Sequence, residues 1–288
     1  MKDETKCLHA GYTPKNGEPR VLPIVQSTTY VYESAAEVAG IFDDPTKGLC
    51  YSRFANPTVM AVEEKIAALE GGVGAMCTTS GQAATLLSIL NICQAGDSII
   101  STPEIYGGTI NLFSFTLKKL GIECIYVDKN MSDDEIKACF KENTKLVFGE
   151  TIANPALTVF DIERFANIAH AMGVPLIVDN TFATPILCKP FDFGADIVVH
   201  STSKYMDGHA VQIGGCGVGR GRGTKVSWGT AASSTGIMAS SQSLSSLTNP
   251  TMEPAIQNLM AIWHISSRQE CSSCVTSVYI QPHILHSC

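Results

Sequence analysis

The sequence predicts an α/β fold, a three-layer α/β/α sandwich built on a mostly parallel sheet. From about residue 75 onward, short apolar runs alternate with segments of helical spacing. This alternation is typical of parallel strands covered by helices on both faces. The chain has 288 residues, of which 45% are hydrophobic and 16% charged, a globular composition. Polar and aromatic residues follow the apolar runs, which is where ligands bind in such sheets.

The composition also excludes several classes of protein. The formal net charge is −7 and no basic cluster stands out, so we expect no nucleic-acid partner. No apolar run is long enough to span a membrane, and the charged start of the chain lacks the apolar core of a signal peptide. The first seven of the eleven cysteines are scattered through apolar segments, as in a reducing compartment. These features predict a cytoplasmic protein.

We expect an N-terminal arm over residues 1–53. Four Pro and Gly residues interrupt it between positions 14 and 23, and residues 21–32 are extended in character. Such an arm either wraps a neighbouring subunit or lies as a strap on its own domain, and the sequence leaves both alternatives open.

Residues 54–215 are predicted to form the main domain. A first helix begins at Asn56 or Thr58, either of which can cap it, and ends at Gly71-Gly72. Strands are expected over residues 75–79, 98–102, 123–127, 146–149, 176–178 and 196–199. Further helices are expected over residues 80–93, 110–120, 133–140 (with Ser132 as its cap) and 162–172.

The carboxyl ends of these strands carry polar and aromatic residues. They are Ser80-Gly81-Gln82, Tyr106, Glu150 with Asn154, Asp179-Asn180-Thr181, and Ser201 to Lys204. Because parallel strands share one carboxyl edge, we predict that these residues converge on a single site.

Lys204 follows an apolar strand and stands next to three hydroxyl side chains, Ser201, Thr202 and Ser203. A lysine held in a polar pocket can lose its proton and attack a carbonyl, forming a Schiff base. The neighbouring hydroxyls could hold a phosphate. We therefore predict that Lys204 anchors pyridoxal 5′-phosphate (PLP); the alternative is a partly exposed loop lysine.

Two further segments favour the same cofactor. Asp179 ends a buried apolar strand, where a lone charge is costly and a protonated pyridine nitrogen would be a partner. The turn at Gly81 and Gln82 opens a helix whose free N–H groups attract an anion. For this turn, a plain helix cap is the alternative.

Three other residues are weaker candidates. The ring of Tyr106 could stack on a flat heterocycle; the alternative is a half-buried loop tyrosine that binds no ligand. Tyr51 and Arg53 lie on the same side of a segment expected to be extended. Together they could grip a phosphate, and an ordinary ion pair is the alternative.

Five ordered motifs resemble the Cys/Met-metabolism family of PLP-dependent enzymes, and within it the O-acetylhomoserine sulfhydrylases most of all. The likeness spans residues 5–215. The motifs begin at Tyr51 (YSRFANPT), Thr79 (TSGQAA), Glu150 (ETIANP), Val178 (VDNTFATP) and His200 (HSTSKYMDGH).

The resemblance implies fold type I of the PLP-dependent transferases and a role for each matching residue. Lys204 would form the Schiff base and shuttle protons, and Asp179 would hold the pyridine nitrogen. Tyr106 would stack on the ring and assist proton transfer, and Asn154 would lie near the ring hydroxyl.

The resemblance also implies how the phosphate is held. Tyr51 and Arg53 would reach the phosphate of a neighbouring subunit, so a homotetramer with shared sites is implied. Within one chain, four residues would bind the phosphate: Gly81, Gln82, Ser201 and Ser203.

The implied reaction is γ-replacement on the amino acid O-acetylhomoserine by sulfide or methanethiol, which gives homocysteine or methionine plus acetate. Lys204 would remove the α proton, and acetate would leave from the γ carbon. A methionine γ-lyase and a cystathionine synthase or lyase remain alternatives. Gly108 stands where methionine γ-lyases carry cysteine, which argues against that member.

Residues 216–288 depart from the family in composition. The family continues with a C-terminal domain that supplies an arginine for the substrate carboxylate, whereas this segment is rich first in Gly and Arg and then in Ser. We expect an atypical, poorly ordered tail of the kind a frame shift produces, on a truncated enzyme of poor turnover; an inactive chain is a further alternative. A single CxxC motif, Cys271 to Cys274, is a weak zinc signal, so no metal site is expected.

Overall fold

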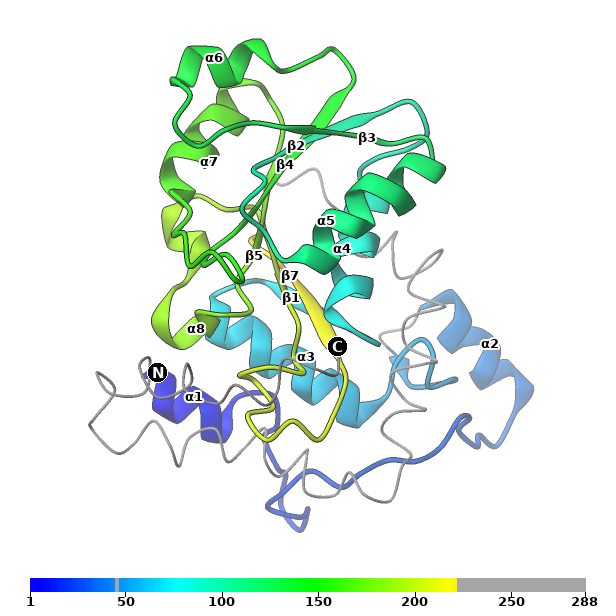
Figure 1. Cartoon of the computed structure of the whole chain (residues 1–288). Helices are drawn as coiled ribbons and strands as arrows, with labels where there is room; N and C mark the ends of the chain where they lie inside the picture. Colours follow the sequence, from blue (N-terminus) through cyan, green and yellow to red (C-terminus); the bar gives the residue numbers. More distant parts are fainter. Residues whose placement is uncertain (45–46, 222–288) are drawn as a thin grey trace.

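The computed structural model describes residues 1–44 and 47–221. A seven-stranded sheet runs through this part of the chain in the order β1-β7-β6-β5-β4-β2-β3 (Figure 1). The neighbouring strands are parallel except for β7, which lies antiparallel between β1 and β6. The predicted α/β fold with a mostly parallel sheet is therefore confirmed.

The strands correspond to the predicted apolar runs, apart from β7, which is not among them. They are β1 (Gly74–Thr78), β2 (Ser98–Ser101), β3 (Glu123–Tyr126), β4 (Thr144–Glu150), β5 (Leu176–Asp179), β6 (Ile197–His200) and β7 (Gly215–Gly219). The α-helices are α1 (Asp3–His9), α2 (Ala35–Asp43), α3 (Pro57–Glu70), α4 (Gly81–Leu90), α5 (Gly107–Asn111), α6 (Asp133–Ala138), α7 (Ile162–Ala171) and α8 (Thr184–Leu187). Two other helical segments are the π-helix η2 (Leu112–Leu117) and the 3-10 helix η3 (Pro190–Phe193).

Two apolar clusters on opposite faces of the sheet produce the three layers. On one face α3, α6 and α7 pack on the strands, with Phe165 and Val198 in their cluster. On the other face α4 and η2 pack, with Phe113 and Val199. Val198 and Val199 are neighbours in β6 and face opposite layers, as the alternation of side chains along a strand requires. In Figure 1, α7 and α5 accordingly flank the sheet from opposite sides.

Two helix starts form as the sequence predicts. The side chain of Asn56 accepts hydrogen bonds from the backbone N–H groups of Thr58 and Val59, so Asn56 is the cap of α3. Ser132 caps α6 and forms a reciprocal capping box with Glu135.

The N-terminal arm contains more regular structure than expected. Helices α1 and α2 form within it, although α1 has no buried residue and α2 buries only Ile41. Such short helices with little buried surface leave no clear apolar period in the sequence. The Nζ of Lys65 in α3 donates to the carbonyl of Cys7, 2.8 Å away. Helix α1 therefore contacts α3 of its own chain, and the choice between strap and subunit-wrapping arm remains a prediction.

The second half of the domain differs from prediction at two places. The helix expected over residues 110–120 begins earlier, as α5, and continues as the π-helix η2. Strand β7 has the sequence GCGVG, which lacks the apolar run expected of a strand. The sheet therefore extends four residues past the predicted domain boundary at residue 215. That boundary remains a prediction, and the rest of the expected tail, with its CxxC motif, lies outside the described residues.

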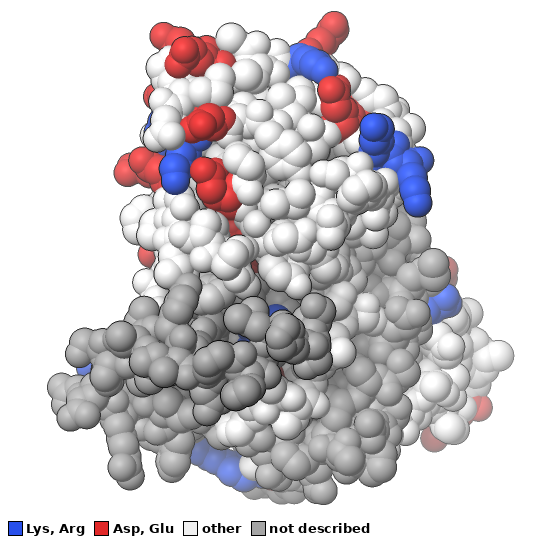
Figure 2. All heavy atoms as spheres, viewed as in Figure 1, with Lys and Arg blue, Asp and Glu red and all other residues white. Residues whose placement is uncertain are grey.

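Charged side chains of both signs are interspersed on the face shown in Figure 2. Near α6 they pair, as Arg164 with Asp133 at 2.6 Å and Lys137 with Asp134 at 3.5 Å. Among the described helices, none combines the length and apolar composition needed to cross a membrane.

We predict that Gly215→Ala weakens the contact between β7 and β1. A Cβ at position 215 would lie 2.3 Å from the carbonyl oxygen of Ser80, and overpacking of this kind typically costs about 1–3 kcal/mol. Urea unfolding should show this loss of stability. Gly74→Ala, where an added Cβ meets nothing within 4 Å, is the matched control; equal unfolding midpoints for the two variants would contradict the prediction.

Candidate functional site

The predicted site residues that follow β1, β2, β4, β5 and β6 lie at one edge of the sheet. Strands β4, β5 and β6 are parallel, so their carboxyl ends meet there. Because β7 is antiparallel, its first residue reaches the same edge, where Gly215 pairs with Thr78 and Cys216 with His200. The turns after β1 and β6 therefore come together over the start of β7.

The turn after β1 forms a close-packed helix start. The Ser80 side chain accepts from the N–H of Ala83 and caps α4. A Cβ on Gly81 would lie 2.6 Å from the Cβ of Ser201, so only glycine allows this approach. The start of the ten-residue helix α4 therefore lies against Ser201, and its first N–H groups suit an anion.

The loop after β6 presents Lys204 at the surface of this edge. Lys204 is exposed, and its backbone N–H donates to the carbonyl of Ser201. Ser203 is bonded to Gly214 instead of facing outward: its Oγ donates to the Gly214 carbonyl at 3.2 Å and accepts the Gly214 N–H at 2.8 Å. A phosphate held by Ser203 would have to compete with these two bonds.

Asp179 ends β5 as a half-buried carboxylate. Its Oδ1 accepts from the Thr181 backbone N–H at 3.0 Å and from the Thr181 hydroxyl at 2.5 Å. Burial raises the pKa of Asp179, while the bonds from Thr181 and the charged form of His200 act in the opposite direction. A cation next to Asp179 would therefore be stabilised by a carboxylate that lacks solvent.

Glu150 lies beside Asp179, because the two residues are partners in the β4–β5 register. Its Oε2 accepts the backbone N–H of Tyr106 at 2.5 Å. Burial and the nearby charge of Asp179 raise the pKa of Glu150 to about 8, which the bond from Tyr106 opposes. Glu150 thus fixes the turn that carries the Tyr106 ring, which is 42% exposed.

Gln82 and Asn154 extend the site along this edge. The Gln82 side chain donates to the Thr109 hydroxyl at 3.0 Å, which ties α4 to α5 and the Tyr106 turn. The Gln82 side chain is therefore already hydrogen-bonded to Thr109. Its backbone N–H lies in the first turn of α4. Asn154 is half-buried on the loop that follows β4.

Tyr51 and Arg53 lie on the N-terminal segment before α3. Their segment is a turn, because the N–H groups of Phe54 and Ala55 donate to the Tyr51 carbonyl; the expectation of extended chain here is wrong. The turn forms as the chain enters the helix capped by Asn56. The Arg53 guanidinium nevertheless lies over the Tyr51 ring, 5.3 Å from its centre, so the two side chains are together as predicted.

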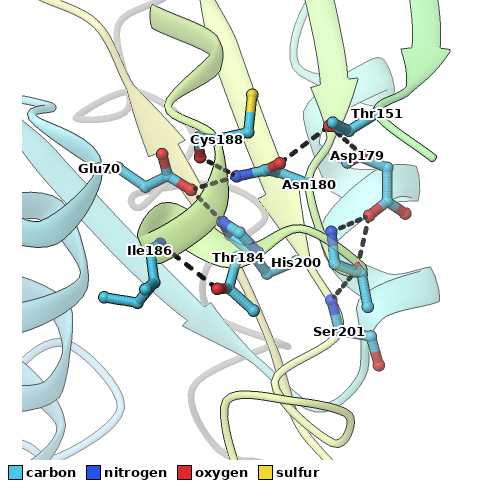
Figure 3. Close-up of polar contacts among 10 residues, drawn as sticks. Glu70, Thr151, Asp179, Asn180, Thr184, Ile186, Cys188, His200 and Ser201 are labelled. Carbon is cyan, nitrogen blue, oxygen red and sulfur yellow. Dashed lines mark hydrogen bonds and ion pairs between the residues drawn. The ribbon is translucent and has the colours of Figure 1, made fainter. Parts of the chain in front are cut away.

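Sequence reasoning did not assign a role to several polar residues behind this edge. Glu70, Asn180 and His200 are each at most 1% exposed, and Glu70 is hydrogen-bonded to both of the others (Figure 3). One signal was present: Glu70 is the last residue of α3, where the helix dipole disfavours an acid that has no partner.

The residues at the edge fit PLP. The start of α4 beside Ser201 suits its phosphate, and the half-buried carboxylate of Asp179 suits its protonated ring nitrogen. The close backbone approach that Gly81 allows beside Ser201 and the exposed Lys204 complete a set of groups of the right chemical types.

Comparisons with known proteins give the same family as the motifs. A sequence model described as "Cys/Met metabolism PLP-dependent enzyme" matches residues 4–249. The chain is 46% identical over 213 residues to O-acetyl-L-homoserine sulfhydrylase of Corynebacterium glutamicum, which is 74% of this chain and 49% of that protein. It is 43% identical over 223 residues to homocysteine/cysteine synthase of Saccharomyces cerevisiae, 76% of this chain and 50% of that protein. The chain thus spans about half the length of the curated relatives it matches.

Two solved structures are similar to this one. A putative O-acetylhomoserine (thiol)-lyase of Campylobacter jejuni, which carries N'-pyridoxyl-lysine-5'-monophosphate, superimposes with a TM-score of 0.74 at 30% identity, over 92% of this chain and 69% of that chain. Cystathionine γ-lyase of Lactobacillus plantarum complexed with L-serine gives a TM-score of 0.78 at 30% identity, over 98% of this chain and 70% of that chain.

We predict that the free energy of unfolding falls as pH rises, because two buried carboxyl groups must ionise in the folded chain. The pKa is raised to about 8 for Glu150 and to about 7 for Glu63. Each group makes its full contribution to the free energy of unfolding below its unfolded pKa. This contribution is lost as the pH rises through its pKa in the folded chain. From about pH 5 to pH 7 both groups contribute to the loss, whereas between pH 7 and pH 8 the loss comes mainly from Glu150, so Glu150→Gln should remove it.

Urea unfolding at pH 5, 7 and 9 measures this effect. Glu63→Gln is the matched control, since it should reduce the loss below about pH 7 and leave the loss between pH 7 and pH 8 in place. A wild-type unfolding free energy that does not decrease from pH 5 to pH 9 would contradict the assignment of buried, protonated carboxyl groups.

Proposed function

The chain belongs to the Cys/Met metabolism PLP-dependent enzyme family, and from this premise we propose that Lys204 binds PLP covalently at the carboxyl edge of the sheet. The observation that carries the proposal is the meeting of the Lys204 loop, the start of α4 and the Asp179 carboxylate at one edge. When bound, PLP supplies an electron sink for a carbanion next to the substrate amino group.

In this proposal each residue of the chain has a limited task. The Nζ of Lys204 bonds the cofactor and then holds and returns the α proton. Asp179 keeps the ring nitrogen protonated, with Thr181 orienting the carboxylate from 2.5 Å. The Tyr106 ring would be available to stack on the cofactor, and the Glu150 contact holds its turn in place.

The phosphate is assigned to the backbone of Gly81 and Gln82 and to the hydroxyls of Ser201 and Ser203. The close approach of Gly81 to Ser201 supports the first three of these contacts. Ser203 serves only when its bonds to Gly214 open. Asn154 is assigned to the ring hydroxyl.

For the reaction we propose γ-replacement on O-acetylhomoserine with sulfide or methanethiol, in cytoplasmic sulfur amino-acid metabolism and methionine biosynthesis. The support is the identity of 46% to the Corynebacterium glutamicum sulfhydrylase. A lyase reaction is the second candidate. Cystathionine γ-lyase of Lactobacillus plantarum superimposes with a TM-score of 0.78, compared with 0.74 for the Campylobacter jejuni (thiol)-lyase. A Cβ on Gly108 would lie 2.5 Å from the Tyr106 ring, so a cysteine there would move that ring.

We propose a homo-oligomer in which Tyr51 and Arg53 complete the site of a neighbouring copy. The segment around them exposes apolar side chains, with Val31 98% and Phe54 51% accessible. Exposed apolar groups of this kind mark surfaces that are covered in an assembly. The family tetramer is the assembly we expect.

Adding PLP to the purified chain should give a visible absorption band, and borohydride reduction should abolish this band while fixing the cofactor covalently to the protein. Lys204→Ala should lose the band, since it removes the amine that bonds the cofactor. Lys141→Ala is the matched control, an exposed lysine paired with Glu123 at 2.6 Å. Mass spectrometry of the reduced protein should place the adduct on Lys204; a band that persists in Lys204→Ala would refute the assignment.

The reaction class is tested by comparing substrates on the PLP-loaded chain. Homocysteine formation from O-acetylhomoserine and sulfide should exceed ammonia release from methionine, cysteine or cystathionine. Faster release from any of the three would favour the lyase reaction instead. Binding of PLP with no turnover of any substrate would show a cofactor-binding chain that does not catalyse the proposed reaction.

A further inference from the structure

A buried polar cluster lies behind the edge that carries Asp179 and Lys204. Its centre is one carboxylate oxygen, Glu70 Oε1, which contacts His200 Nε2 at 2.5 Å and accepts from Asn180 Nδ2 at 3.1 Å (Figure 3). The side chains of Glu70 and His200 have no exposed surface. This short contact between a carboxylate oxygen and an imidazole nitrogen is the closest polar link of the cluster.

The cluster joins the ends of two neighbouring strands. Asn180 directly follows Asp179 at the end of β5, and His200 directly precedes Ser201 at the end of β6. Asn180 also donates to the Cys188 carbonyl at 2.9 Å and accepts from the Thr151 hydroxyl at 2.9 Å. One buried carboxylate from α3 therefore holds the residues adjacent to two predicted cofactor contacts.

A second bridge joins the same strand ends through Thr181. The Thr181 hydroxyl donates to Asp179 and accepts the Ser201 backbone N–H at 2.8 Å. Asp179 and Val199 belong to the face of α4 and η2 by strand alternation, whereas His200 belongs to the opposite face. The two strand ends are thus joined by Thr181 and, from behind, by Glu70.

Stability alone does not account for the Glu70–His200 pair. Buried ion pairs can often be replaced by apolar residues of similar volume without loss of stability, whereas removing one partner is strongly destabilising. Within the described residues, Glu70 Oε2 and His200 Nδ1 are buried without a hydrogen-bond partner, which adds to the cost of the pair. Such a pair is best explained by what it positions.

We propose that Glu70 and His200 are positioning residues of the cofactor site, which fix the ends of β5 and β6 so that Asp179 and the Lys204 loop are aligned for PLP. The proposal rests on the proposed function of this edge. The pair touches neither cofactor nor substrate and acts through Asn180 and the backbone of Ser201.

The pair also contributes to the electrostatics of Asp179. The charged form of His200 lowers the pKa of that carboxyl, against the effect of burial. The other titratable groups around the cluster include Glu150 on β4, Cys77 on β1, Cys216 on β7, Glu63 on α3, Cys188 after α8 and Asp192 in η3. All of these are acids, so His200 is the group among them that favours an ionised Asp179.

The test measures PLP binding and folding separately in four variants of the full chain. His200→Gln and Glu70→Ala should each weaken PLP binding by about ten-fold or more, as loss of outer-shell partners does in metal sites. Glu70→Gln keeps an acceptor for Asn180 and should bind PLP more tightly than Glu70→Ala. His170→Gln is the matched control, since His170 pairs with Asp196 at 2.8 Å but is exposed; its PLP affinity should equal that of the wild type.

A double variant separates positioning from simple stability. Glu70→Met combined with His200→Leu removes both partners and should recover the thermal midpoint lost in the single variants. Its PLP affinity should stay low if the pair positions the strand ends. Recovery of wild-type PLP affinity along with stability would overturn the proposal, even if the single variants fail to fold.

The pH profile of PLP affinity gives a further readout. Acidification weakens binding as Asp179 is protonated, and without His200 the pKa of Asp179 rises. The acid limb should therefore move to higher pH in His200→Gln and remain in place in His170→Gln. Wild-type protein that binds no PLP would instead overturn the proposed function, whereas wild-type binding with an unchanged His200→Gln profile and affinity would overturn only this inference.

Discussion

The insertion of β7 between β1 and β6 is the constraint on which the candidate site depends. Two strand spacings separate β1 from β6, about 10 Å in all, and an antiparallel β7 allows the turns after both strands to close over its first residue. Gly215 and Gly81 make this possible, because a side chain at either position would meet Ser80 or Ser201 at less than 3 Å. The helix start that suits an anion and the loop that carries Lys204 therefore become neighbours through a strand that has little side-chain volume of its own.

Much of the architecture follows from local patterns. Apolar runs predict strands β2 to β6, which are four to seven residues long. Apolar residues at helical spacing predict α3, α4 and α7. The position of Asp179 follows from the same pattern, since an acid directly after a buried apolar strand can only lie at the strand end. The side-chain caps of α3 and α6 are likewise local, because Asn56 and Ser132 bond backbone groups within three residues of themselves.

What the sequence did not reveal depends on contacts between distant residues. Strand β7 carries three glycines in five positions, and only pairing on both sides makes it a strand. Glu70 and His200 are 130 positions apart, so no spacing rule links them. The turn at Tyr51 contacts a distant segment, because the Ser52 N–H donates to the Thr28 carbonyl and Asn56 Nδ2 donates to the Val25 carbonyl. The π-helix η2 likewise follows α5 without any local signal that we identified.

Two carboxyl groups on adjacent strands set the proton balance of the site. Asp179 and Glu150 are register partners, and burial raises the pKa of both. A cation beside Asp179 favours its ionised form, and a charged Asp179 in turn favours the protonated form of Glu150. The proton that the two groups retain is then best placed on Glu150. A protonated carboxyl still accepts through its carbonyl oxygen, so the Tyr106 N–H keeps its partner and the position of the Tyr106 ring does not depend on that proton.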